Sequence, residues 1–419
     1  MTSNIDSETR QFIRNPVLVL LQMMRKRFCI QRFVLLFLAV SLLSVLQAGD
    51  AVYVTTFRDP CRMLEVHRLT TLSANVEKLA VSDGAGSRMV AVTVVPIPGT
   101  GHVLHRALVD GLLPASEIKL RFGLDNEFRV RTLPNNLERP LRIATGGDTM
   151  HKSEWFAATT KVVAARDPDL VVFGGDLAYE DGKNGDRVLT WIRSYFESAR
   201  APDGRLLPFI SCIGNHEVVG HYGGDITKAP FYFAMMPING IAYAAVDIGE
   251  QLSFILLDTD HATRMPGVQT DWLSSAITAR AKRTHVIPVY HYPAWPTVKA
   301  KKGATPYDDR VSLLVRQLWL PLFEAHGVRL ALEHDQHSFK RTVAIKDGKA
   351  DPTGITYLGD GAWGVEVRPV FPGLPFMAKT ASRRHAWMLE LHSDGRVDAI
   401  AIDENALIFD QVTIPAKLP

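Results

Sequence analysis

The sequence predicts an α/β protein: a four-layer α/β/β/α sandwich preceded by a smaller all-β sandwich domain. Three observations predict it: short alternating apolar segments before position 134, alternation of strand and helix patterns after position 141, and acidic or imidazole side chains directly after several later strands. Alternating strands and helices are typical of a mostly parallel sheet with helices on its faces. A chain of 419 residues is long enough for two such folded units.

The segment 51–134 is expected to form the all-β domain. Its short strand patterns are separated by Gly, Pro, Asp and Ser turns, a spacing that is typical of a β-sandwich. The run 106–114, which leads into 118–122, resembles the strand-turn-strand of a fibronectin type III module. Because no titratable cluster occurs there, we expect this domain to pack beside the larger one and to help shape its cleft.

The segment 141–419 is expected to form the larger domain, after a polar linker at 134–140. Strand patterns at 141–147, 170–175 and 206–214 alternate with helices at about 154–165 and 186–198. A hairpin around 249–251, a helix at 270–281, a strand at 285–291, a helix at 311–326 and a strand at 328–333 follow. Further strand patterns near the C-terminus indicate a second sheet that packs face to face with the first.

The first 49 residues are expected to be a signal peptide or an anchor. Basic residues precede an uncharged apolar run from Phe33 to Leu46, which is short for a membrane span and suits a secretory signal. We expect export to the periplasm or the exterior with cleavage near Ala48, with an uncleaved membrane anchor as the alternative. This leader carries six basic and two acidic residues, so the rest of the chain has a net charge of about −1. The small excess of basic residues over the whole chain is therefore not a nucleic-acid-binding signature.

The cysteines exclude a disulfide scaffold. One of the three, Cys29, falls in the leader, which leaves Cys61 and Cys212. A bridge between them is possible in an oxidising compartment, but Cys212 lies in an apolar strand pattern, which favours a free buried thiol.

Polar side chains follow several of the predicted strands. The stretch 174–182, GGDLAYEDG, places Asp176 and Tyr179 just after an apolar strand. Asp148 lies in an earlier acidic turn, Asn215 in an Asn-His turn, and His291 at the end of a strand, while the cluster EHDQHSFKRT occupies 333–342. Each residue alone is most often a turn, capping or core residue. Their joint placement at strand ends on one sheet edge predicts a pair of metal ions, since such cations need several oxygen and imidazole donors at once.

In this order and spacing, the motifs GGDLAYEDG, IGNHE and HSFKRT resemble those of the calcineurin-like metallophosphoesterases. Within them, the sequence is similar to the purple acid phosphatase-like branch with its N-terminal fibronectin-like domain. The resemblance implies that Asp148 is a terminal ligand of the first metal, that Asp176 bridges both metals, and that Tyr179 is a phenolate ligand. It also implies Asn215 and His291 as ligands of the second metal, and His337 as a ligand of the first.

The resemblance implies roles beyond the metals as well. His216 is expected to face the bound phosphate, as a donor to an oxygen or as the proton source for the leaving group. Arg341 is a second candidate for phosphate contact. The implied cofactors are two metal ions, iron with iron, zinc or manganese.

Three positions depart from the family's pattern. Met150 stands where many relatives have a histidine ligand, which agrees with the presence of Tyr179. Asp335 stands where the first histidine of a Gly-His-x-His-x-Tyr motif belongs, so Asp335 is the expected seventh ligand; if the strand bulges, His334 takes that place. No histidine occurs at 296–325, where the acidic branch tends to carry proton donors, and this puts acid-optimum activity in doubt.

The predicted activity is that of a phosphomonoester hydrolase, in which paired cations acidify a water that attacks phosphorus. A phosphodiesterase or nucleotidase on the same fold is the alternative, and a binding module with a degraded metal site is a third. The expected partner is a phosphorylated small molecule or phosphoester substrate, with a membrane only if the leader stays uncleaved. Six further histidines are expected to be structural or surface residues, and His151, which adjoins the first acidic loop, is the one most open to a role. These histidines are His151, His221, His261, His285, His326 and His385.

Overall fold

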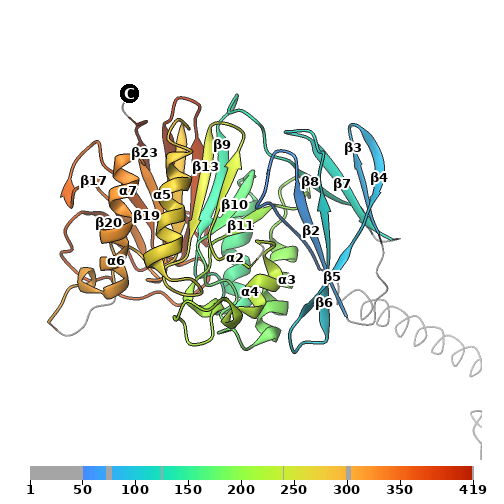
Figure 1. The fold of residues 1–419 in the computed structure, drawn as a ribbon, viewed down its shortest axis with the longest axis horizontal. Helices are drawn as coiled ribbons and strands as arrows, with labels where there is room; N and C mark the ends of the chain where they lie inside the picture. The colour runs from blue at the N-terminus through green and yellow to red at the C-terminus, as the bar shows by residue number, and fades with distance from the viewer. Residues whose placement is uncertain (1–50, 72–77, 124–125, 239, 299–302, 418–419) are drawn as a thin grey trace, which may run out of the picture. The chain divides into compact units, whose positions relative to one another are not determined.

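The computed structural model describes residues 51–71, 78–123, 126–238, 240–298 and 303–417 (Figure 1). The predicted leader at 1–49 lies outside the described residues, so its cleavage or anchoring stays a prediction. Among the residues that are described, no helix is long and apolar enough to cross a membrane.

The first sheet has ten strands within the described part of the chain, in the order β23-β22-β21-β9-β10-β11-β1-β2-β6-β5. Its centre is parallel, because β10 pairs in parallel with both β9 and β11. The strands are β1 (Ala51–Thr55), β2 (Leu64–Thr71), β5 (Thr93–Ile97), β6 (His102–Val109), β9 (Leu141–Gly146), β10 (Leu170–Phe173), β11 (Phe209–Ser211), β21 (His385–Leu391), β22 (Val397–Asp403) and β23 (Ile408–Ile414).

The second sheet has seven strands in the described residues, in the order β12-β13-β14-β15-β19-β16-β20. Its strands are β12 (Ala244–Ile248), β13 (Leu252–Leu257), β14 (His285–Tyr290), β15 (Leu330–Glu333), β16 (Phe339–Thr342), β19 (Thr356–Gly359) and β20 (Met377–Ala381). A small hairpin pairs β17 (Ile345–Lys346) with β18 (Lys349–Ala350). A four-stranded sheet consists of β3 (Leu79–Asp83), β4 (Gly86–Val90), β7 (Glu117–Phe122) and β8 (Phe128–Arg131).

The helices cover the outer faces of the two large sheets. They are α2 (Ser153–Ala164), α3 (Gly185–Ser198), α4 (Pro230–Met235), α5 (Thr270–Thr278), α6 (Arg310–Leu318) and α7 (Leu320–Ala325). Figure 1 shows α2 and α3, in green, beside β10 and β11, and shows α5 to α7, in yellow and orange, beside the second sheet. On the first sheet, Trp191 of α3 packs edge-on against Phe173 and Phe209, with ring centroids 5.8 and 5.5 Å away.

The alternation of side chains along β13 shows how the layers are built. Phe254 and Leu256 belong to the main core, which they share with Ile143 of β9 in the opposite sheet. Ile255 and Leu257 point the other way, into the core beneath α5, α6 and α7. Successive strand residues face opposite sides of a sheet, so each sheet here is buried on both faces. The predicted four-layer α/β/β/α sandwich with an all-β region before it is therefore confirmed.

The N-terminal strands are joined to the first sheet. Strand β1 pairs in parallel with β11 through Thr55 and Phe209, and β2, β6 and β5 continue the sheet beyond it. One face of β1 packs Val52 and Val54 against the four-stranded sheet, while the other face places Tyr53 in the main core. The all-β region is thus a sandwich that shares strands with the larger sheet. The predicted boundaries at 134 and 141, and the likeness to a fibronectin module, stay predictions.

Some predicted elements need correction. The single helix expected at 311–326 is divided into α6 and α7 at Trp319, because Pro321 has no N–H to donate and its ring crowds the preceding turn. Helix α4 and strand β20 were not predicted.

Other predictions are confirmed. The hairpin around 249–251 forms as β12 and β13. Cys61 and Cys212 are both buried and free, as expected for Cys212.

Replacing Tyr53 with alanine is expected to lower the free energy of unfolding of the whole described unit. Its ring stacks on Phe209 with centroids 5.7 Å apart, and its hydroxyl donates to the carbonyl of Met235 at 3.2 Å. Loss of a buried aromatic ring should cost about 3–5 kcal/mol. Chemical denaturation should show one shifted transition, and Tyr53→Phe should lose only about 1 kcal/mol. Two separate transitions, of which only one moves, would contradict the shared core.

Candidate metal centre

The predicted site residues follow strands of both large sheets. Asp148 follows β9, Asp176 follows β10, and Asn215 lies beyond β11. His291 and His334 come directly after β14 and β15 of the second sheet. Ligand atoms of Asp148, Asp176 and His291 lie within 4.8 Å of one another, and all three side chains are buried. The strand ends of the two sheets therefore converge on one small volume.

The backbone of this region is unusual. Residues other than glycine rarely adopt positive φ angles. Those that do cluster at functional sites, where the surrounding structure holds the strained backbone in place. Several predicted site residues are in this left-handed region: Asp148 (φ 56°), Asp176 (φ 53°), Tyr179 (φ 56°), Asp335 (φ 78°) and His337 (φ 56°). The turns that follow the strands therefore bend back sharply, which aims these side chains at a common centre.

One half of the centre consists of Asp148, Tyr179 and His337. The hydroxyl of Tyr179 lies 3.0 Å from Asp148 Oδ1 and 2.9 Å from His337 Nε2. His337 Nε2 is 3.1 Å from the same carboxylate oxygen. The other ring nitrogen of His337 lies 3.1 Å from the carbonyl of Glu366, which orients the imidazole with Nε2 toward the centre.

The other half consists of Asp176, Asn215 and His291. His291 Nε2 lies 3.3 Å from Asp176 Oδ2 and 3.1 Å from Asn215 Oδ1. His291 Nδ1 lies 2.8 Å from the carbonyl of Gly174, so Nε2 is the nitrogen that faces the centre. The backbone N–H of His216 donates to Asp176 Oδ1 at 2.8 Å.

Asp335 connects the two halves. Its backbone N–H donates to Asp148 Oδ2 at 2.9 Å, and its Oδ1 lies 3.7 Å from His291 Nε2. The neighbouring His334 points away, into a space between two glycines. A Cβ atom on Gly174 would lie 1.8 Å from the His334 ring, and one on Gly147 would lie 3.0 Å from it. Of the two alternatives left open by the sequence, the structure places Asp335 at the centre.

His216 lies at the mouth of the centre. Its Nδ1 is 2.5 Å from Asp181 Oδ1, and its ring packs over Tyr179 with centroids 4.4 Å apart. Asp181, His216 and His221 form a second group whose candidate ligand atoms lie within 4.8 Å of one another, and it is more exposed than the first. The imidazole of His216 is thus oriented by a carboxylate and keeps partial access to solvent.

His151 and Arg368 lie at the centre although the sequence interpretation gave neither a role. The His151 ring is 4.5 Å from that of Tyr179 and 5.2 Å from that of His337. Burial, aided by His337, lowers the pKa of His151 to about 4, so it is neutral at physiological pH. Arg368 Nη1 donates to the carbonyl of Asp335 at 3.2 Å. In the sequence, the position of His151 beside the first acidic loop pointed to a role at the centre, whereas no motif marks Arg368.

Arg341 has a different environment. Its Nε donates to Asp410 Oδ2 at 2.7 Å, and Lys379 joins the same carboxylate at 3.3 Å. The guanidinium is therefore engaged between β16 and β23 rather than with the residues of the centre. Contact between Arg341 and a phosphate stays a prediction, and the pairing with Asp410 does not favour it. The guanidinium of Arg368, which bonds to Asp335, is better placed to contact a phosphate.

The donor set fits metal ions. Three buried carboxylates, those of Asp148, Asp176 and Asp335, share this volume with imidazole and phenol groups. Burial alone would lower the pKa of His291, but the carboxylates, Asp176 first, raise it to about 10. Burial and then Asp148 raise the pKa of the Tyr179 phenol. The shift of His291 reflects the negative charge of the carboxylates around it, which divalent or trivalent cations with oxygen and nitrogen ligands would neutralise.

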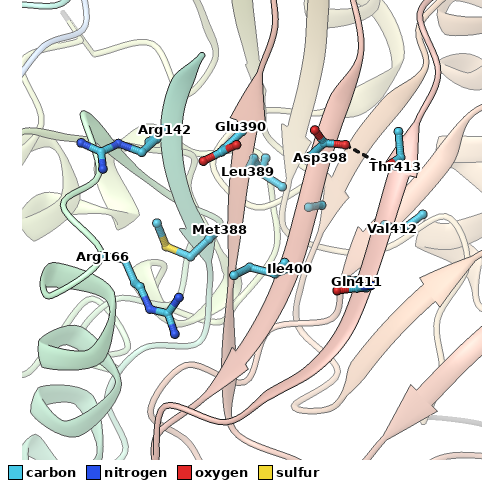
Figure 2. Close-up of a pocket in the computed structure, with 11 residues that line it drawn as sticks. Arg142, Arg166, Met388, Leu389, Glu390, Asp398, Ile400, Gln411, Val412 and Thr413 are labelled. Atoms are coloured by element: carbon cyan, nitrogen blue, oxygen red, sulfur yellow. Dashed lines mark hydrogen bonds between the residues drawn. The ribbon is translucent and has the colours of Figure 1, made fainter. Parts of the chain in front are cut away.

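A cavity of about 580 Å³ lies away from this centre, on the face of the first sheet near β9 and β21 to β23. Figure 2 shows Arg142 and Arg166 on one side of it, and Glu390 and Asp398 on the neighbouring strands β21 and β22. Asp398 accepts a hydrogen bond from Thr413 Oγ1 at 2.7 Å. None of the predicted site residues lines this cavity.

Comparison with known proteins finds related sequences and a similar fold. Residues 141–333 match the family model of the calcineurin-like phosphoesterases. Two curated relatives from Arabidopsis thaliana are 25% identical to the chain: purple acid phosphatase 21 over 279 residues and purple acid phosphatase 22 over 252 residues. The predicted resemblance to the calcineurin-like phosphoesterases is confirmed.

The extent of these matches is limited. The alignment with purple acid phosphatase 21 covers 62% of this chain and 58% of that relative, and the second covers 57% and 54%. The chain thus spans less than three fifths of the length of either relative. The solved structure of purple acid phosphatase PPD1 from yellow lupin (Lupinus luteus) seeds superimposes with a TM-score of 0.69 at 14% identity. It covers 87% of this chain and 74% of the lupin chain, and it supports the fold alone.

Glu217 holds the turns of the centre together, and its removal is expected to loosen them. Its carboxylate accepts from the backbone N–H groups of Asp176 at 2.8 Å, Leu177 at 2.7 Å and Gly214 at 2.7 Å. Glu217→Ala would leave three buried donors without partners, for a loss of about 3 kcal/mol or more in unfolding free energy. Glu217→Gln, which keeps one carbonyl oxygen, should lose less. Equal loss in both variants by chemical denaturation would contradict this role.

Gly174 and His334 are expected to be energetically coupled. Gly174→Ala places a Cβ inside the His334 ring, so we expect a loss of about 1–3 kcal/mol from overpacking. Neither nitrogen of this buried ring has a hydrogen-bond partner, so truncating the His334 side chain leaves no other polar group without its partner. The double variant Gly174→Ala/His334→Ala should therefore be more stable than Gly174→Ala alone. Additive losses in a double-mutant cycle would contradict the packing described here.

Proposed function

We propose that the chain is a two-metal phosphoesterase that hydrolyses phosphomonoesters. The observation that carries the proposal is the convergence of Asp148, Asp176 and Asp335 with His291 and His337 in one buried volume. Asp148, Tyr179 and His337 would hold one ion, Asn215, His291 and Asp335 the other, and Asp176 would bridge them. When bound, such a pair supplies an acidified water and neutralises charge on the phosphate.

The chain's own residues would position the substrate and move its protons. Nδ1 of His216 is held by Asp181, so its other nitrogen can donate to a phosphate oxygen or to the leaving group. Arg368, which donates from its guanidinium to the carbonyl of Asp335 and from its backbone N–H to that of His337, would contact the phosphate.

Three further points belong to this proposal. Export through the N-terminal leader suits an enzyme that acts outside the cytoplasm. An iron ion beside Tyr179, with iron, zinc or manganese as the second ion, suits a site with a phenolate ligand. The substrate is a phosphorylated small molecule or phosphoester.

A phosphodiesterase or nucleotidase is the second candidate function. No histidine occurs at 296–325, next to the His291 motif, so the chain offers His216 as the proton donor from this part of the centre. A diester with a good leaving group needs less protonation of that group than an alkyl monoester. Comparing rates on an aryl monoester and an aryl diester separates the two functions.

Replacing Asp176 with asparagine is expected to abolish turnover, because the carboxylate that would bridge the two ions loses its charge. The purified full chain should contain about two metal equivalents and should hydrolyse an aryl phosphate. Asp176→Asn should lose metal, and its kcat/KM should fall by roughly 100-fold or more.

The matched control is Asp186→Asn, an exposed aspartate at the start of α3, which should leave metal content and rate unchanged. A binding module with a degraded site predicts the opposite for Asp176→Asn, with every measurable property intact. Fewer than two metal equivalents in the wild-type chain, together with no turnover, would exclude the proposed function.

A further inference from the structure

Asp260, in the loop after β13, holds two arginines. Its carboxylate is 1% exposed, and its backbone has a positive φ of 74°. Oδ2 accepts from Arg264 Nη1 at 3.2 Å and from Arg310 Nη2 at 2.8 Å, while Oδ1 accepts from the backbone N–H of Met265 at 3.1 Å. One buried carboxylate therefore fixes the positions of two guanidinium groups that come from different elements.

The two guanidinium groups remain largely open to solvent. The side chain of Arg264 is 57% exposed and that of Arg310 is 64% exposed. Asp260 balances one of their two positive charges, which leaves a net charge of +1 on the three groups. A guanidinium has five N–H donors, so the bond to Asp260 leaves most of its donors available for an anion.

This arginine pair lies beside the metal centre, on the side of His291. Strands β13 and β14 are parallel neighbours with Leu257 opposite Tyr290. The loops that carry Asp260 and His291 therefore begin side by side at the same edge of the sheet. The ring of His261, the residue after Asp260, is 5.6 Å from that of His291.

The loop that follows Asn215 contacts the loop that carries Asp260, and so links the arginine pair to the metal centre. Gly223 N–H donates to the carbonyl of Asp260 at 3.4 Å, and Gly224 N–H donates to that of His261 at 3.0 Å. Arg264 crosses directly over Gly224, where a Cβ would lie 2.7 Å from its side chain. The pKa of the Tyr222 hydroxyl is raised by burial and then by Asp335, and Arg310 opposes this rise, so that hydroxyl is within electrostatic range of both the centre and the pair.

We propose that Arg264 and Arg310 form an anion-binding subsite that takes a second phosphoryl group of the substrate. This inference rests on the proposed function, since the centre would bind the phosphate that is cleaved. Planar guanidinium groups match phosphoryl oxygens and bind them through paired, charge-assisted hydrogen bonds. The substrate class is then a phosphate ester that carries a second phosphoryl group, rather than a simple monoester.

The test is binding of non-hydrolysable probes to the metal-loaded full chain by calorimetry. Methylphosphonate is compared with a series of alkane-α,ω-diphosphonates of increasing chain length, so that one of them can reach from the centre to the arginines. The best diphosphonate should bind at least roughly tenfold more tightly than methylphosphonate. Arg264→Gln and Arg310→Gln should each remove most of that gain, and each variant leaves the other arginine paired with Asp260.

Arg166→Gln provides the matched control, because Arg166 is an exposed arginine near the end of α2, away from the centre, and should keep the full gain. Equal binding of methylphosphonate and every diphosphonate by the wild-type chain, or a gain that survives both variants, overturns the subsite. Because the readout is binding, this result is distinct from failure of the proposed function, which appears as absence of aryl phosphate turnover.

Discussion

The mutual repulsion of three buried carboxylates is the constraint on which the arrangement of this protein depends. Asp148, Asp176 and Asp335 are nearly inaccessible to solvent and approach one another through His291. Burying like charges together is strongly unfavourable unless hydrogen bonds, opposite charges or metal ions compensate. The chain supplies backbone N–H donors to Asp148 and Asp176 and raises the pKa of His291, so part of the compensation is its own. The rest is what bound cations would provide.

The surrounding structure resists the collapse or spreading of this centre. Glu217 binds three backbone N–H groups from two turns of the first sheet. Beneath the second sheet's turns, the buried Lys340 pairs with Glu333 and donates to the carbonyl of Trp295 at 2.7 Å. Tyr290 donates to the same glutamate at 2.6 Å. Each sheet thus has one buried glutamate that fixes the turns after its strands, and positions defined in this way are what a two-metal centre requires.

Much of this could be predicted from sequence because it depends on local pattern. Apolar runs that end in Asp148, Asp176 or His291 mark strands and their carboxyl ends, and parallel strands bring such ends to one edge. The division at Trp319 was missed although Pro321 signals it, because the apolar pattern on either side is continuous. Arg341 and Arg368 show the limit: Arg341 lies in the last motif but pairs with Asp410, whereas Arg368, outside every motif, bonds to Asp335. Sequence spacing carries no information about such competing partners.

The pair His334 and Asp335 illustrates why register decides chemistry here. His334 and Asp335 are adjacent in the sequence, so a shift of one position would exchange a carboxylate for an imidazole beside His291. The glycines at 147 and 174 leave room for the ring of His334, because a Cβ on either would lie within 3.0 Å of it. A side chain at position 174 would overlap that ring, and one at position 147 would crowd it, so the ring would have to move. Two residues without side chains therefore make room for His334, while its neighbour Asp335 has its carboxylate near His291.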